Sequence, residues 1–122
     1  MFGILMNKLS NNRIEIFSWA QMPEKFIGIC LLPNGSKYWL TNGLFHREDG
    51  PAAILANGIK IWYLNNKCIW SSNWDKLDFT NKIILSKERH SMYPTVQVWK
   101  YIDENGIKEQ IVILGMEEYI SQ

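Results

Sequence analysis

The chain lacks most of the patterns that mark common functional classes. Its 122 residues include only two cysteines, Cys30 and Cys68, which lie far apart and outside any CxxC or Cys/His spacing. Metal binding is therefore unsupported, and reduced, buried thiols are expected. No apolar run approaches the roughly 20 residues of a membrane-spanning helix, and residues 1–6 are too short for a signal peptide. We expect a cytoplasmic protein with no membrane association.

An excess of charge of one sign is also missing. Thirteen Lys and Arg residues stand against twelve Asp and Glu residues, for a formal net charge of +1. This balance gives no strong signal for nucleic acid or anionic lipid as a partner, although it leaves room for a local basic patch. No GxGxxG, Walker, GxSxG or HExxH string is present. The sequence thus predicts a protein that is not an enzyme and has no cofactor.

An internal repeat occupies the middle of the chain. Six residues recur 23 positions later: Leu32, Asn34, Gly35, Lys37, Trp39 and Asn42 return as Leu55, Asn57, Gly58, Lys60, Trp62 and Asn65. The two Asn-Gly pairs predict hairpin tips, because both residue types tolerate the positive φ of a two-residue turn. Side chains alternate after each tip, which predicts strands with Trp39 and Trp62 on a common surface.

Further strands and one helix are predicted around the repeat. Residues 2–6 and 13–19 fit strands joined near Asn11-Asn12, and residues 116–120 fit a short helical turn. We expect a single domain over residues 1–122, mainly β with one helix (α+β). Its predicted architecture is an antiparallel meander: tandem hairpin repeats at 26–70, a helix at 73–90 and a C-terminal hairpin at 95–114.

The junction of the two copies carries the string HREDGPA at residues 46–52, followed by NGxKxWYLNxK at residues 57–67. Over residues 27–70 the chain resembles the short β-hairpin repeats, related to MORN-type repeats, of bacteriophage and giant-virus proteins. The resemblance implies a hairpin-repeat fold and a viral setting, and therefore the cytoplasm of a host cell. It implies no activity and provides no catalytic residue.

The charged loop at residues 46–49 has two interpretations. His46, Glu48 and Asp49 are residue types of an acid/base group, and Arg47 is able to bind an anion. A local ion pair and turn-stabilising bonds of Asp49 explain the same residues, and we favour this structural interpretation. His90 is expected in the last turn of the predicted helix, where cations complement the helix dipole. No catalytic residue is predicted.

A binding role is the remaining hypothesis. Tryptophan and tyrosine dominate interface hot spots, and most of these rings lie within or beside the repeat. We predict a phage-type accessory protein that binds a host protein and inhibits a bacterial defence complex. The predicted partner-binding residues are His46, Arg47, Glu48, Asp49, Lys37, Trp39, Lys60 and Trp62. Two alternatives stay open: a nucleotide or other small ligand held between Trp39 and Trp62, with a homodimer as one form of this binder, and a structural tile of a larger assembly.

Overall fold

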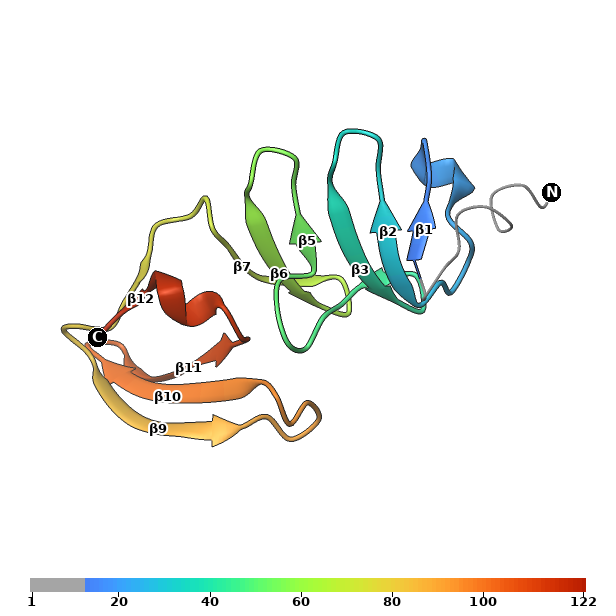
Figure 1. Ribbon diagram of the computed structural model, residues 1–122. Coiled ribbons are helices and arrows are strands. Elements are labelled where there is room, and N and C mark those ends of the chain that lie inside the picture. Colours follow the sequence, from blue (N-terminus) through green and yellow to red (C-terminus); the bar gives the residue numbers. More distant parts are fainter. Residues whose placement is uncertain (1–12) are drawn as a thin grey trace. The chain divides into compact units, whose positions relative to one another are not determined.

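The computed structural model describes residues 13–122, which form strands joined by turns and two 3-10 helices. Their contacts define two compact units. Unit 1 comprises residues 13–47 and 51–71, and unit 2 comprises residues 48–50 and 72–122. Each unit has a sheet of its own, blue to green for unit 1 and yellow to red for unit 2 (Figure 1). That residues 1–122 form a single domain stays a prediction.

Unit 1 is a mixed, seven-stranded sheet with the strand order β1-β2-β3-β5-β6-β7 and with β4 paired to β3. The strands are β1 (Arg13–Glu15), β2 (Gly28–Leu31), β3 (Lys37–Thr41), β4 (Leu44–Phe45), β5 (Ala53–Ile54), β6 (Lys60–Leu64) and β7 (Lys67–Ser71). The predicted, purely antiparallel meander is wrong, because β1 runs parallel to β2. The connection between them, which contains the 3-10 helix η1 (Trp19–Gln21), is long enough for this crossover.

The hairpin tips of the repeat lie at the predicted Asn-Gly pairs, but the two-residue turn predicted there is wrong. Gly35 has a φ of 94°, and its N–H donates to the carbonyl of Leu32 at 3.0 Å, whereas Asn34 does not adopt a positive φ. This is the three-residue loop with a left-handed glycine, and the second copy repeats it at Gly58. Asn42 and Gly43, with φ values of 52° and 77°, instead form a two-residue turn between β3 and β4.

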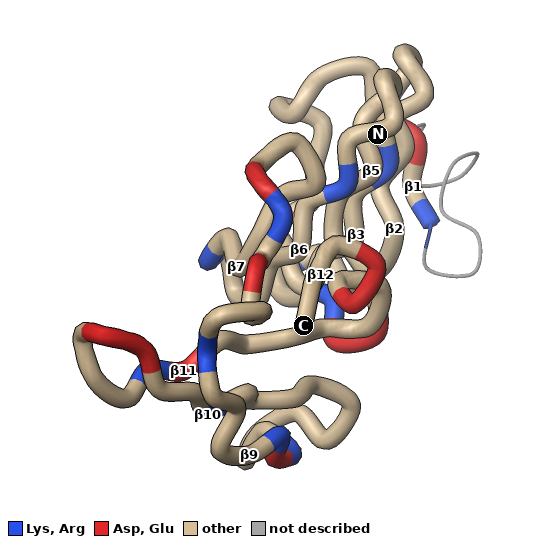
Figure 2. Tube along the Cα trace, turned by 90° about the vertical axis from the view of Figure 1, so that its left-hand side faces the viewer, with Lys and Arg blue, Asp and Glu red and all other residues tan. Residues whose placement is uncertain are grey.

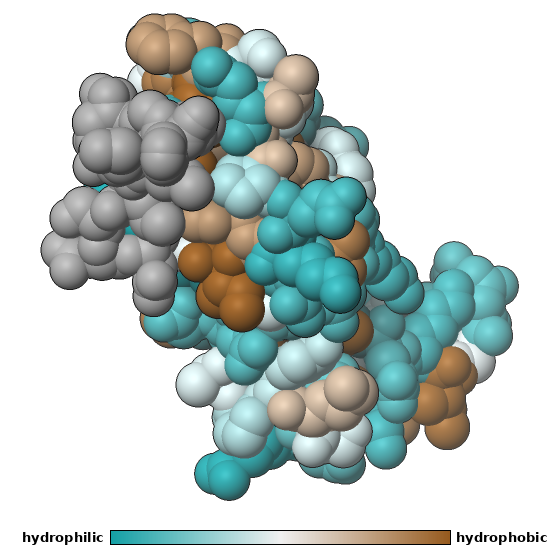
Figure 3. Space-filling model, turned by 90° about the vertical axis from the view of Figure 1, so that its right-hand side faces the viewer, coloured by the Kyte–Doolittle hydropathy of each residue, from teal (hydrophilic) through white to brown (hydrophobic). Residues whose placement is uncertain are grey.

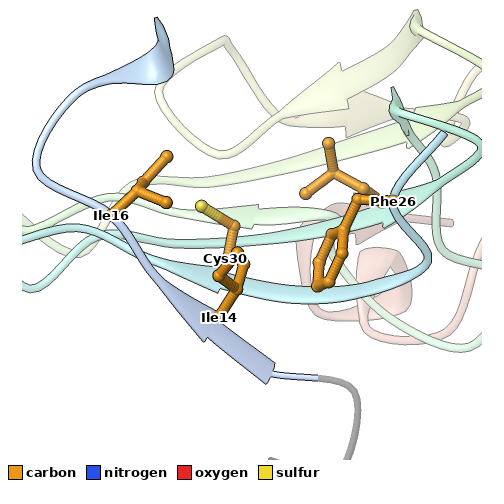
Figure 4. Packing of buried hydrophobic residues seen from close by; sticks show 5 residues of the cluster. Ile14, Ile16, Phe26 and Cys30 are labelled. Carbon is orange, nitrogen blue, oxygen red and sulfur yellow. The ribbon is translucent and has the colours of Figure 1, made fainter. Parts of the chain in front are cut away.

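The hydrophobic core of unit 1 lies on one side of its first strands. Ile14 of β1, Cys30 of β2 and Leu40 of β3 pack there with Ile16 and Phe26, and all five are buried. Figure 4 shows Ile14 and Cys30 beside one another, with Ile16 and Phe26 from the connecting segment on either side of them. The connection between β1 and β2 therefore covers this end of the sheet.

Unit 2 contains a three-stranded antiparallel sheet with the order β11-β10-β9. Its strands are β9 (Ile83–Arg89), β10 (Gln97–Asp103) and β11 (Gly106–Val112), and the turn between the last two contains Gly106 at a φ of 110°. The short strands β8 (Leu77–Asp78) and β12 (Ile120–Ser121) pair in parallel, and the 3-10 helix η2 (Met116–Tyr119) precedes β12.

The predicted helix at residues 73–90 is wrong. This segment contains β8 and β9, and the only helices among residues 13–122 are η1 and η2. Asp78 forms a turn, in which its carboxylate accepts hydrogen bonds from the N–H and the hydroxyl of Thr80 at 2.9 and 2.7 Å, and residues 83–89 are a strand because they pair with β10. His90 consequently follows a strand, and its Nδ1 accepts the N–H of Met92 at 3.0 Å. Neither described helix is long and apolar enough to cross a membrane.

The N-terminal predictions have a mixed outcome. The strand predicted over residues 13–19 ends at Glu15, and Ser18 is the N-cap of η1, where its hydroxyl accepts the N–H of Ala20. The strand predicted at residues 2–6 and the turn at Asn11-Asn12 lie outside the described residues.

Candidate functional site

The sheet of unit 1 places its charged side chains on one face. Residues that face each other on paired strands project to the same side, and neighbours along a strand alternate. Lys37 faces Ile54, and Ile54 faces Lys60. Every charged strand residue of unit 1 falls on this side, which we call the charged face: Arg13, Glu15, Lys37, Lys60 and Lys67. The opposite side, the uncharged face, presents Ile14, Cys30, Tyr38, Leu40, Ala53, Ile61 and Tyr63.

The charged face brings three of the predicted partner-binding residues together. Lys37 and Lys60 are both half-buried and stand two strands apart, which corresponds to about 10 Å. Trp39 is half-buried on the same face. Trp62 shares that face but has no exposed surface, and its ring centroid lies 5.9 Å from that of Trp70. The expectation that Trp62 belongs to an exposed surface is therefore wrong, because its ring is part of the buried core.

Arg47 covers the ring of Trp39. Its guanidinium carbon lies 4.1 Å from the ring centroid, and its Nη1 donates to the carbonyl of Pro51 at 3.1 Å. The backbone N–H of Arg47 donates to the carbonyl of Tyr63 at 3.2 Å, which fixes the residue on β6 of the second copy. A planar guanidinium stacks well on an aromatic ring. One side of Trp39 is thus occupied by the protein itself.

His46 connects the two copies of the repeat. Its backbone N–H donates to the carbonyl of Trp39, and its Nδ1 accepts the N–H of Asn65, both at 3.0 Å. The side chain is 7 % exposed. Because Nδ1 acts as an acceptor, this nitrogen carries no proton. The His46 ring therefore connects the end of β4 to the turn after β6 through a hydrogen bond.

The remaining two residues of the predicted charged loop belong to the other unit. Glu48 and Asp49 lie in unit 2, whereas His46 and Arg47 lie in unit 1. The carbonyl of Glu48 accepts the hydroxyl of Thr95 at 2.8 Å. The structure therefore assigns the four predicted loop residues to two separately packed parts of the chain.

An aromatic cluster that the sequence analysis missed lies on the uncharged face. Tyr38 is 5.0 Å from Trp19 and 5.2 Å from Phe45, and Phe45 is 5.2 Å from Tyr63, measured between ring centroids. Trp19 is 44 % exposed, and the other three rings are half-buried. The sequence does indicate these tyrosines. Tyr38 is next to Trp39 and Tyr63 is next to Trp62, so alternation along each strand places both tyrosines on the side opposite the tryptophans.

The thiols of unit 1 are held in their neutral form. Burial raises the pKa of Cys30 to about 11, and burial is also the main reason why the pKa of Cys68 is raised. Tyr38, which faces Cys30, has a raised pKa for the same reason. A thiolate is the reactive form of cysteine, so these environments suppress nucleophilic chemistry at neutral pH.

A cleft of about 340 Å³ separates the two hairpin tips and is lined by Asn34, Ser36, Tyr38, Leu55, Ala56 and Asn57. Its polar groups stabilise the tips: Asn34 Oδ1 accepts the N–H of Ser36 at 2.9 Å, and Ser36 Oγ accepts the N–H of Ala56 at 3.0 Å. Over residues 13–122, no group of three or more His, Cys, Asp or Glu side chains is placed to hold a metal ion. The cleft is lined by no ionisable group except the Tyr38 phenol.

Comparison with known proteins gives no match. No protein-family model, curated protein or solved structure matches the chain.

Proposed function

We propose that this chain is a non-enzymatic protein that binds another protein through the charged face of unit 1. The observation that carries the proposal is the row Lys37, Ile54 and Lys60, which the strand register places side by side. Trp39 lies on the same face, and so does Leu44, which faces Thr41 and is 37 % exposed. Protein interfaces typically combine aromatic and apolar side chains at their centre with a polar rim.

The proposed partner is a protein of a host bacterium, and inhibition of a defence complex is the sharpest form of the proposal. This part depends on the HREDGPA string and its resemblance to repeats of viral proteins. A nucleotide stacked between Trp39 and Trp62 has less geometric support. Arg47 already occupies one side of the Trp39 ring, and the Trp62 ring is buried.

A capture experiment tests the proposal. The tagged protein is immobilised and exposed to bacterial lysate, and bound proteins are compared with those captured by Leu44→Asp and Leu85→Asp. Leu85 is a matched control, because it is a 52 % exposed leucine of unit 2. Figure 3 shows that hydrophobic side chains do reach the surface of the molecule among hydrophilic ones.

We expect one captured protein to be lost with Leu44→Asp and retained with Leu85→Asp, while far-UV circular dichroism shows both variants folded. A carboxylate in place of Leu44 would be unfavourable within an interface, because it would lose its hydration there. Equal capture by both variants and the original protein would show that the charged face is not the binding surface.

A further inference from the structure

The two faces of the unit 1 sheet differ sharply in charge. The strand residues of the charged face include four cations and one anion, Glu15, whereas those of the uncharged face include no charged residue. Arg47 adds a fifth cation, since its guanidinium lies on the Trp39 ring of that face. The cations are therefore gathered on one surface.

The two units also differ in charge, although the whole chain is nearly neutral. From residue 13 onward, unit 1 has two acidic residues, Glu15 and Glu24, against six basic ones: Arg13, Lys25, Lys37, Arg47, Lys60 and Lys67. Unit 2 has six basic and ten acidic residues. Figure 2 marks these positions in blue and red along the chain. The net charge of +1 thus arises because the charges of a basic unit 1 and an acidic unit 2 largely cancel.

The arrangement of the cations indicates what kind of surface they fit. Lys37 and Lys60 stand on either side of Ile54, with Leu31 next to Lys37 in the same row. The two ammonium groups thus originate about 10 Å apart with an apolar side chain between them. A complementary surface has carboxylates at a similar separation around an apolar residue, because opposite charges favour association and apolar surface favours apolar contact.

Nucleic acid fits this surface less well than protein does. Single-stranded nucleic acid binds where exposed aromatic rings stack on bases beside a basic groove. Here Trp39 is covered by Arg47, and Trp62 is buried. The half-buried Ile54 and the exposed Leu44 instead present aliphatic surface between and beside the cations.

We propose that the charged face of unit 1 binds an acidic protein segment that carries apolar residues between its carboxylates. This inference rests on the proposed function and names the partner by its chemistry. The cations raise the association rate and select the partner, and the aliphatic residues hold it after contact. Binding is then sensitive to salt, because exposed charges are screened beyond the Debye length.

A defined probe tests this proposal. A fluorescent twelve-residue peptide of alternating Glu and Leu is titrated with the full chain at about 25 and about 300 mM NaCl, and binding is followed by anisotropy. A peptide of alternating Lys and Leu and an oligothymidylate of the same length are titrated in parallel. The variants are Lys37→Glu/Lys60→Glu and, as a control with the same change in net charge, Lys76→Glu/Arg89→Glu in unit 2, where both residues are exposed.

We expect the Glu-Leu peptide to bind, the Lys-Leu peptide not to bind, and the higher salt concentration to weaken binding. Lys37→Glu/Lys60→Glu should weaken binding by about tenfold or more, and the unit 2 control by less than about twofold. Lys37→Gln/Lys60→Gln should lie between them, because it removes the attraction without adding repulsion, and far-UV circular dichroism checks that each variant is folded.

Four results would overturn the proposal, and the last of them leaves the proposed function intact. The first is equal weakening by both double variants, and the second is tighter binding of oligothymidylate that depends on Lys37 and Lys60. The third is salt-sensitive self-association that the same substitutions abolish, since this identifies a second copy as the occupant. If a lysate protein is lost with Leu44→Asp but retained at high salt and by Lys37→Glu/Lys60→Glu, the acidic partner is excluded while the proposed function stands.

Discussion

Replacement of Arg47 by alanine removes two contacts that the structure assigns to the fold rather than to a partner. One is the stacking of the guanidinium on Trp39 at 4.1 Å, and the other is the hydrogen bond to the carbonyl of Pro51 at 3.1 Å. A cation over a half-buried ring contributes about 1 kcal/mol, and a charged hydrogen bond in a partly buried site contributes about as much. Arg47→Ala should therefore lower the free energy of unfolding by about 2 kcal/mol.

A double-mutant cycle isolates the stacking contribution. Urea unfolding of the original protein, Arg47→Ala, Trp39→Leu and the double variant is followed by far-UV circular dichroism. The coupling between Arg47 and Trp39 should be about 1 kcal/mol, and Arg47→Lys should retain less than half of it, because an ammonium does not stack as a plane. Arg89→Ala, at an exposed position of β9, is the control and should change stability by less than about 0.5 kcal/mol.

The reasoning fails if the coupling is below about 0.3 kcal/mol, which is the level expected of independent sites. It also fails if Arg47→Ala leaves the unfolding curve unchanged and abolishes capture of a partner. In that case Arg47 would act directly on the partner, as the sequence analysis predicted.

Three other substitutions and one titration give further tests. His46→Ala should lower the free energy of unfolding by about 2 kcal/mol, and His46→Asn by less, because an amide oxygen replaces Nδ1 as the acceptor for Asn65; equal losses would contradict that role. Gly58→Ala should lower it by about 1 kcal/mol although a Cβ meets nothing within 4 Å, because the φ of 92° is unfavourable for alanine; an unchanged urea midpoint would refute this. Cys30 should make stability fall as pH rises from 9 towards 11, because its thiol loses its proton near 9.0 when unfolded and near 11 when folded. The unfolded state therefore binds fewer protons in that range. Cys68 and Tyr38, whose pKa values are also raised, add a slope of the same sign, so the slope between pH 9 and 10 should become less steep in Cys30→Ala, and an unchanged slope would exclude a contribution from Cys30.

Local turn chemistry could be predicted from the sequence because glycine and asparagine determine it within a few residues. The positive φ values at Gly35 and Gly58 lie at the two Asn-Gly pairs of the repeat. The choice between a two-residue and a three-residue loop was not predictable from those pairs alone. It depends on the register of the flanking strands. Leu31 pairs with Lys37, which leaves a three-residue loop, whereas a two-residue loop would pair Leu32 with Lys37.

The errors arose where partners distant in sequence decide the structure. Ile83, Ile84 and Leu85 allow a helical stripe, yet pairing with β10 makes them a strand, and β-branched residues fit that state. The parallel pairing of β1 with β2 likewise depends on contacts across the η1 connection. Residue type alone also could not separate Trp39 from Trp62, since their different burial depends on Arg47 and Trp70, which approach from other segments.

The two lysines of the repeat are similarly buried in the two copies, whereas the two tryptophans are not. Trp39 and Trp62 occupy the same position in their copies but have different surroundings, whereas Lys37 and Lys60 are both half-buried on the charged face. Lysine is a poor strand residue, and an apolar or β-branched residue would extend a sheet better. The proposed acidic partner accounts for two lysines at this position. Because each copy advances the sheet by two strands, the duplication itself fixes a separation of about 10 Å between the lysines, and the carboxylates of the proposed partner would have to match this spacing.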